Sequence, residues 1–126
     1  MCVKLFLRGD GMLEINMEFR KGILFIRLSG VLDKGTVSKL NSEVTELVKD
    51  NGIKNIVFNI DKLTSIDLKG INCLLYNYEL SRMNDGRAML CGVNNSLVRY
   101  RINNSRLVNY MYEVSDELSA IKVIGM

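Results

Sequence analysis

The side chains best suited to chemistry in this sequence are carboxylates near the middle of the chain. Asp61 and Asp67 are close enough in sequence to share a site, and two adjacent carboxylates can bind a metal ion or act as general acid and base. Such a site normally needs further polar ligands, but the intervening Leu63 and Ile66 are apolar. We therefore predict turn, capping or interaction roles for both carboxylates, with no catalytic residue and no metal site.

Other routes to catalysis are missing from the sequence. Histidine is absent, which excludes Ser-His-Asp and Cys-His catalysis and His-ligated zinc. No glycine-rich phosphate loop of the GxGxxG or GxxxxGK[ST] type occurs. Cys2, Cys73 and Cys91 are too far apart for a CxxC motif, and an odd count argues against a secreted disulfide framework. We expect buried free thiols, no cofactor and no enzymatic activity.

The elements that must position these residues alternate between strand and helix. Period-two alternation over residues 13–19 and an apolar run over 23–28 predict a hairpin. Helical spacing over 37–48 ends before Gly52, a suitable left-handed cap, and the apolar run 55–60 is typical of a strand covered on both faces. The later elements are a helix from about 67, a strand over 88–93, a helix from Asn95 or Ser96 to about 103, a strand over 108–114 and a helix opened by 115–116.

This order predicts one α/β domain with right-handed crossovers. We expect a mixed, mostly parallel sheet of about five strands, with an antiparallel first hairpin and four helices. Residues 1–11 fit the scheme poorly and are interpreted as an N-terminal extension of a domain over 12–126. Met12 is an alternative start, and an intact-mass measurement on the protein from its own cells would reject that start if residues 1–11 were present.

Composition and net charge exclude some classes of binding partner for this chain. The chain has 126 residues, a net charge of +3 and a pI of about 8.8, short of the clustered basic footprint of a nucleic-acid-binding domain. No segment reaches the roughly 20 apolar residues of a membrane span, and the first residues do not form a signal peptide. We expect a cytoplasmic protein without a membrane span and without direct nucleic acid binding.

The most specific pattern lies in residues 59–71. An apolar strand leads to Asp61, a short connection follows, and the tetrad Asp67-Leu68-Lys69-Gly70 opens a helix. This resembles the signature of the STAS family (sulfate transporters and anti-sigma factor antagonists), whose tetrad is Asp-Ser-Ser-Gly-like. Residues 28–33 are similar to the family's Gly-x-Leu-Asp turn, and the resemblance extends over roughly residues 12–126.

The resemblance implies a STAS-like fold and a partner-switching function in bacteria. Antagonists of this family bind an anti-sigma factor that is also a serine kinase, which releases the sigma factor, and phosphorylation of a serine at the helix start cancels the binding. Leu68 occupies that serine position and has no hydroxyl, so no phosphorylation is expected there. The resemblance therefore implies an anti-sigma factor antagonist without the usual switch. Thr64 and Ser65, in the predicted loop before the helix, are the alternative sites of phosphorylation.

Six residues form the partner-binding surface that we predict: Asp33, Lys34, Asp67, Leu68, Lys69 and Gly70. Local chemistry marks the same place, because Asp67 is a favourable N-cap whereas Lys69 opposes the helix dipole. Leu68 is either exposed or packed into the core. The family fold implies that Asp33 and Lys34 lie beside the start of this helix, and the expected partner is an anti-sigma factor or serine kinase.

Other interpretations remain open on the sequence. A STAS subunit of a stress-sensing scaffold, or of a membrane transport ATPase complex, needs no switch. A module that binds a nucleotide or lipid at the carboxyl end of the sheet is a further alternative. Arg99, Arg101 and Arg106 with Tyr100 form a basic patch, either a solvated helix face or a site for an acidic partner or lipid headgroup. Homodimerisation and the identity of the sigma factor are not indicated by the sequence.

Overall fold

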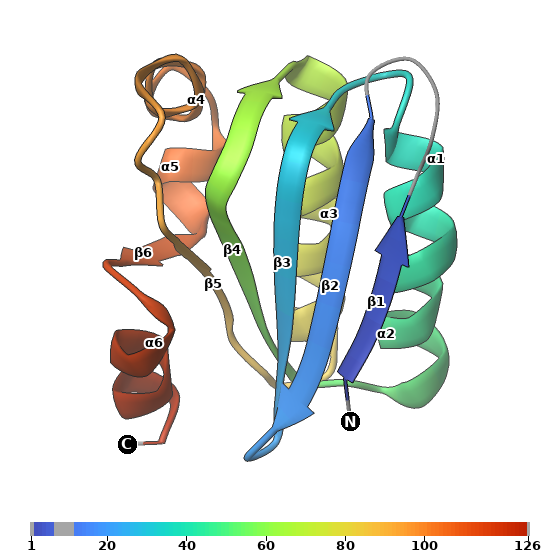
Figure 1. Cartoon of the computed structure of the whole chain (residues 1–126). Coiled ribbons are helices and arrows are strands. Elements are labelled where there is room, and N and C mark those ends of the chain that lie inside the picture. Colours follow the sequence, from blue (N-terminus) through green and yellow to red (C-terminus); the bar gives the residue numbers. More distant parts are fainter. Residues whose placement is uncertain (1, 7–11, 126) are drawn as a thin grey trace.

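The fold is built on one six-stranded sheet with strands in sequence order (Figure 1). The structure, a computed structural model, describes residues 2–6 as backbone and residues 12–125 in full. The first two pairings along the sheet are antiparallel and the other three are parallel, which confirms the predicted mixed α/β class. The strands are β1 (Cys2–Phe6), β2 (Leu13–Arg20), β3 (Ile23–Leu32), β4 (Asn55–Ile66), β5 (Ala88–Cys91) and β6 (Tyr112–Val114). β1 adds an edge strand to the five expected, and residues 1, 7–11 and 126 lie outside the described part.

Helices cover the two faces of the sheet unequally. They are α1 (Val37–Leu40), η1 (Asn41–Thr45), α2 (Glu46–Asn51), α3 (Leu68–Met83), α4 (Ser96–Asn103), α5 (Leu107–Tyr110) and α6 (Glu117–Ile124). Alternate residues of a strand point to opposite faces, so Leu24 and Ile26 join the larger core under α1, α2 and α3, whereas Phe25 joins a smaller one under α6 (Figure 1). None of the helices in the described residues is long and apolar enough to cross a membrane.

The helix predicted over residues 37–48 forms with a π-helical turn, η1, in its middle. At this turn the Thr45 hydroxyl donates a hydrogen bond to Asn41 Oδ1 (3.2 Å) and accepts one from Asn77 Nδ2 of α3 (3.0 Å). π turns are rare and often occur at special contacts, here a buried polar link between two helices. Gly52 ends the segment with φ of 59°, as predicted for a left-handed cap.

Two strands extend further than their apolar runs predict. β3 does not end at Gly30 but passes through it to Leu32, because this glycine has φ of +100° and lies against the Met12 carbonyl, where no Cβ would fit. β4 continues past its apolar run to Ile66, although Asp61 is exposed to solvent. As a result both strands end together, with Leu32 paired to Ile66.

The strand predicted over residues 108–114 is wrong in its first half, which forms α5, whereas β6 covers only Tyr112–Val114. The alternation of apolar residues in this segment is misleading, because Val108 and Tyr110 are exposed. Leu107 and Met111 are buried instead, and their spacing of four is that of a helix, with Met111 N–H donating to the Leu107 carbonyl at 3.0 Å.

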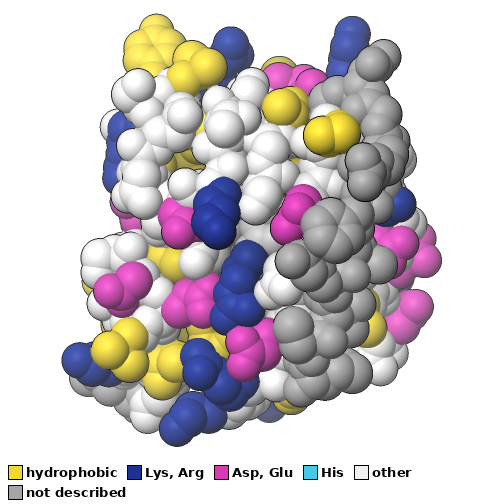
Figure 2. All heavy atoms as spheres, viewed as in Figure 1, with side chains coloured by type: hydrophobic (Ala, Val, Ile, Leu, Met, Phe, Trp, Pro, Cys, Tyr) yellow, Lys and Arg dark blue, Asp and Glu magenta, His cyan; other side chains and the backbone are white. Residues whose placement is uncertain are grey.

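An ion-pair network lies on the sheet face next to α6. Arg27 of β3 donates to both carboxylate oxygens of Glu117 (2.7 and 2.8 Å) and to Glu18 (2.8 Å). Asn59 of β4 donates to the same Glu117 at 2.9 Å. Figure 2 shows acidic and basic side chains interleaved over the middle of this face. The network fixes the N-terminal turn of α6 to the sheet.

Candidate functional site

The shared end of β3 and β4 brings Asp33, Lys34 and Asp67 together. The Asp67 backbone N–H donates to the Leu32 carbonyl at 3.2 Å, and the Lys34 N–H donates to Asp67 Oδ2 at 3.0 Å. The carboxyl ends of parallel strands are where α/β proteins usually place their binding surfaces. The structure therefore places Asp33 and Lys34 beside the start of α3, as the resemblance to the family fold implied.

Asp67 is the N-cap of α3. Its backbone is extended, and its Oδ1 accepts a hydrogen bond from the Gly70 N–H at 2.9 Å, as predicted for a capping aspartate. Because one of its oxygens accepts from the turn after β3 and the other from α3, this carboxylate joins that turn to the first turn of the helix. Gly70 makes the approach close, since a Cβ there would overlap the Leu32 carbonyl and lie 2.9 Å from the Ile66 side chain.

Leu68 is exposed in the first turn of α3, with 67% of its surface accessible. This decides between the two arrangements left open by the sequence, because the side chain does not pack into the core. Lys69 is exposed beside it, near the positive end of the helix dipole, which is unfavourable for a cation by about 0.3–1 kcal/mol. An exposed leucine and an exposed lysine at one helix start contribute little to stability and are available for contact with another molecule.

The turn that carries Asp33 and Lys34 is held by a threonine that the sequence analysis did not single out. Thr36 is buried, and its hydroxyl donates to the Val31 carbonyl at 2.9 Å and accepts from the Asp33 N–H at 3.0 Å. Asp33 Oδ1 in turn accepts from the Gly35 N–H at 2.8 Å. Side chains of Asp and Thr that bond to nearby backbone are a recognisable turn signal, so the Asp-Lys-Gly-Thr run could have revealed this brace.

Asp61 and Asp67 do not form a joint site. Because β4 runs through to Ile66, the two carboxylates are separated by about 20 Å of extended chain at about 3.3 Å per residue. The short connection predicted after Asp61 is therefore wrong, because Asp61 lies within the strand. Within residues 12–125 no group of three or more His, Cys, Asp or Glu side chains is placed to hold a metal ion.

Thr64 and Ser65 also lie in β4 and not in a loop, contrary to expectation. The Thr64 hydroxyl donates to the Gly30 carbonyl at 3.0 Å, and Ser65 is paired with Val31 of β3. A kinase requires its substrate hydroxyl on a segment that can leave its neighbours and enter the active site, and both residues lie within a paired strand, although Thr64 is exposed. Both hydroxyls are therefore poorly placed as substitutes for one at position 68.

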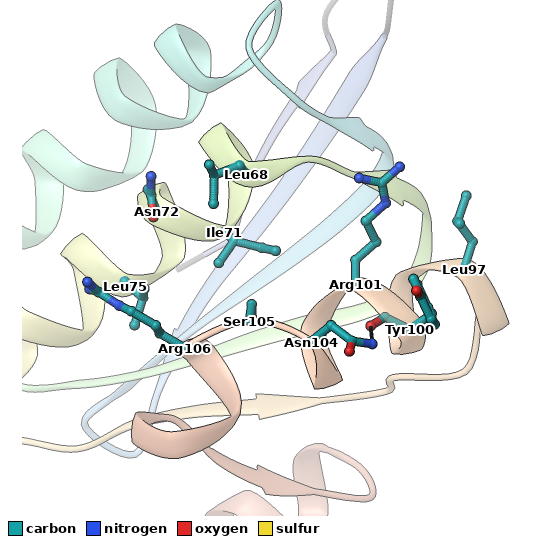
Figure 3. Close-up of a pocket in the computed structure, with 10 residues that line it drawn as sticks. All are labelled: Leu68, Ile71, Asn72, Leu75, Leu97, Tyr100, Arg101, Asn104, Ser105 and Arg106. Carbon is teal, nitrogen blue, oxygen red and sulfur yellow. Dashed lines mark hydrogen bonds between the residues drawn. The ribbon is translucent and has the colours of Figure 1, made fainter.

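The basic patch expected around Tyr100 divides into two parts. Arg99 is engaged within the fold, because its guanidinium contacts Glu113 at 2.8 and 2.7 Å and donates to the Val93 carbonyl at 3.0 Å. Arg101 and Arg106 are exposed, and no ion pair links either of them to another residue in the part of the chain described here. These two arginines border a groove that begins at Leu68 (Figure 3).

Two of the thiols are buried, as expected for Cys73 and Cys91, and both are free. Burial raises the pKa of Cys73 to about 11 and, together with the charge of Glu117, that of Cys91 to about 12. Thiols with such pKa values are poor nucleophiles at neutral pH. The side chain of Cys2 lies outside the described part of the structure.

Known proteins with similar sequences and folds can now be compared with this chain. Residues 14–120 match the family model described as STAS domain. An anti-sigma F factor antagonist from Paenibacillus polymyxa is 29% identical over 109 residues, which cover 86% of this chain and 92% of that protein. An anti-sigma factor antagonist from Mycobacterium paratuberculosis has the same fold, with a TM-score of 0.82, 16% identity and coverage of 95% and 100% of the two chains. The unphosphorylated form of the anti-sigma factor antagonist SpoIIAA superposes with a TM-score of 0.74, 22% identity and coverage of 89% and 97%.

Proposed function

Because the chain belongs to the STAS domain family, we propose that it is an anti-sigma factor antagonist, which binds an anti-sigma factor and so controls transcription indirectly. The relative from Paenibacillus polymyxa, which bears that name and aligns over most of both chains, supports this function. The proposed mode of action is protein–protein contact and not catalysis. It requires the protein to meet its partner in the cytoplasm.

The observation that carries the proposal is the exposed Leu68 on a rigid helix start. Apolar side chains that stay exposed on an ordered element are favourable for association, because burying one against a partner contributes about 1.5–3 kcal/mol. Asp67 fixes the backbone around it through Lys34 and Gly70. Little conformational entropy is then lost when a partner binds this surface of Asp33, Lys34, Asp67, Leu68, Lys69 and Gly70.

The absence of a hydroxyl at position 68 supports an antagonist without the usual phosphorylation switch. A phosphate at this place would add about −1.5 to −2 charges to the contact surface and prevent docking. Leu68 cannot accept one, and Thr64 and Ser65 are held within β4. The protein then stays in the state that binds its partner. The extent of anti-sigma factor binding is set by the amount of this protein in the cell and not by its phosphorylation.

A pull-down from the source organism's own lysate, with bound proteins identified by mass spectrometry, tests the function. Leu68→Glu places a charge at the proposed contact. Leu118→Glu is its matched control, because Leu118 is also an exposed leucine (61%) in the first turn of an aspartate-capped helix. We expect wild type and Leu118→Glu to recover an anti-sigma factor with an ATP-binding kinase fold, and Leu68→Glu to lose it.

A second candidate function is a STAS subunit of a stress-sensing scaffold or of a membrane transport ATPase complex. The leucine at position 68 favours it, since a permanent subunit needs no switch. Recovery of such an assembly without an anti-sigma factor would replace the first proposal with this one. Leu68→Ser separates the two further, because only a cognate kinase recovered with the chain is expected to phosphorylate the introduced hydroxyl, with wild type as the unlabelled control.

A further inference from the structure

A groove runs from Leu68 along α3 and is bounded on its other side by α4 and the turn before α5 (Figure 3). Its volume is about 640 Å³. That size falls within the roughly 300–1,000 Å³ that accommodates a drug-sized molecule, or a few side chains from one face of a short peptide segment. The groove adjoins the surface proposed for the anti-sigma factor, because Leu68 belongs to both.

The groove is apolar on its floor and on part of its rim. Ile71 and Leu75 of α3 form the floor and are nearly buried, whereas Leu97 and Tyr100 of α4 are 47% and 66% exposed. With Leu68 they give the groove apolar side chains from two helices. Large apolar side chains gathered in one concave place, and not scattered singly, mark an interaction site.

The charges at this groove have one sign. Arg101 and Arg106 line it, and none of the described residues that line it is acidic. Figure 3 shows Arg101 extending from α4 toward the start of α3, and Arg106 directed toward Leu75. Arg99 on the same helix differs, because its guanidinium is already paired with the Glu113 carboxylate. Two exposed arginines beside an apolar floor are therefore complementary to a segment that is both acidic and apolar.

We propose that this groove receives an acidic, amphipathic segment of the same anti-sigma factor that contacts Leu68. The apolar side chains of the segment cover Ile71 and Leu75, and its carboxylates pair with Arg101 and Arg106. Helix-in-groove binding of this kind uses anchors spaced along one helix face. The inference rests on the proposed function and adds the chemistry by which the partner is selected.

Charge reversal tests the inference with the anti-sigma factor recovered in the pull-down as purified probe. Arg101→Glu/Arg106→Glu is compared with Arg82→Glu/Arg87→Glu, which makes the same change in net charge at exposed arginines outside the groove. Titration calorimetry at low and high salt is expected to show about tenfold or greater loss of affinity for the groove variant, and a weaker salt dependence than wild type. The control variant is expected to stay within about twofold of wild type.

Photo-crosslinking identifies what occupies the groove. A benzophenone amino acid at Tyr100 is expected to capture a peptide of the anti-sigma factor that is rich in Asp, Glu and apolar residues. Capture of a basic peptide, or unchanged affinity of the groove variant while Leu68→Glu still abolishes binding, would overturn the inference and leave the proposed function standing. Absence of anti-sigma factor binding by wild type would overturn both.

Two other occupants are distinguished by the same variants. Sedimentation velocity would reveal a second copy of this chain if wild type self-associates and Arg101→Glu/Arg106→Glu does not. Flotation with phosphatidylglycerol vesicles would reveal a lipid surface if wild type floats and the groove variant does not. Either result, found together with unchanged binding of the anti-sigma factor by the groove variant, rejects the acidic segment as the occupant.

Discussion

The Asp67 carboxylate joins the turn after β3 to the first turn of α3, so it contributes more to stability than an ordinary helix cap. Asp67→Ala removes the bonds from both Lys34 N–H and Gly70 N–H. We expect the free energy of unfolding to fall by about 1–2 kcal/mol in urea titrations, with Asp67→Asn less affected because its amide oxygen can still accept one bond. Asp116→Ala is the control, since Asp116 only caps α6, and a loss no greater than in that variant would contradict the joining role.

The buried thiols of Cys73 and Cys91 make the free energy of unfolding decrease as pH rises into the alkaline range. Their pKa values in the folded protein are raised from 9.0 to about 11 and about 12. Because the unfolded chain loses these protons first, their contribution is fully present below pH 9 and is lost as pH rises above it. We expect the free energy of unfolding to fall between pH 9 and 11 by up to about 2 kcal/mol per thiol, since one pKa unit corresponds to about 1.4 kcal/mol.

The Cys73→Ala/Cys91→Ala variant isolates this effect from the titration of tyrosines and lysines. Urea titrations at pH 8 and pH 10.5 are expected to give a smaller decrease for this variant than for wild type. Equal decreases would show that the thiols are not protected from ionisation in the folded state.

The docking of α6 depends on one partly buried ion pair. Glu117 accepts from Arg27 and Asn59, and its side chain is only 17% exposed. Glu117→Gln leaves the Arg27 guanidinium without its bidentate partner, so we expect a loss of about 1–3 kcal/mol and faster hydrogen exchange in residues 117–124. Glu113→Gln is the matched control, because Glu113 pairs with Arg99 at the surface (35% exposed) and such pairs contribute about 0–1 kcal/mol. Equal effects of both variants would contradict a special role for Glu117.

The same ion pair predicts that the free energy of unfolding decreases as pH falls into the acidic range. Hydrogen bonding to Arg27 holds the pKa of Glu117 below its usual value of 4.5. A lowered pKa in the folded state contributes stability that is present above pH 4.5 and lost as pH falls below it. Wild type is therefore expected to lose more stability than Glu117→Gln in urea titrations between pH 5 and pH 3, and parallel curves would contradict this.

The order of elements could be predicted because hydrophobic periodicity and caps are local signals. Gly52, Asp67 and Asn95 end or begin helices where the sequence indicates. Element ends were less predictable, since β4 is held to Ile66 by its pairing with β3 and not by apolar composition. The exposed state of Leu68 and the groove beside it depend on how α3 and α4 pack, which a single sequence does not specify.

The position of the domain boundary depends on the whole sheet and not on a single element. The domain proposed for residues 12–126 contains the family match over 14–120 and, among the described side chains, the buried residues of both core clusters. β1 (Cys2–Phe6) nevertheless pairs with β2 along the edge of the sheet. Removing residues 1–11 therefore takes away edge pairing and leaves the described core intact.

We expect the chain that starts at Met12 to fold cooperatively, with a lower melting temperature than the full chain. The new edge, β2, presents unpaired backbone groups, and such edges promote strand-to-strand association. Calorimetry should give a single transition, and sedimentation should show more self-association than for the full chain. A shortened chain without a cooperative transition would mean that β1 is part of the minimal folding unit. The proposed boundary at residue 12 would then be wrong, because edge pairing and not the buried core would decide whether the sheet forms.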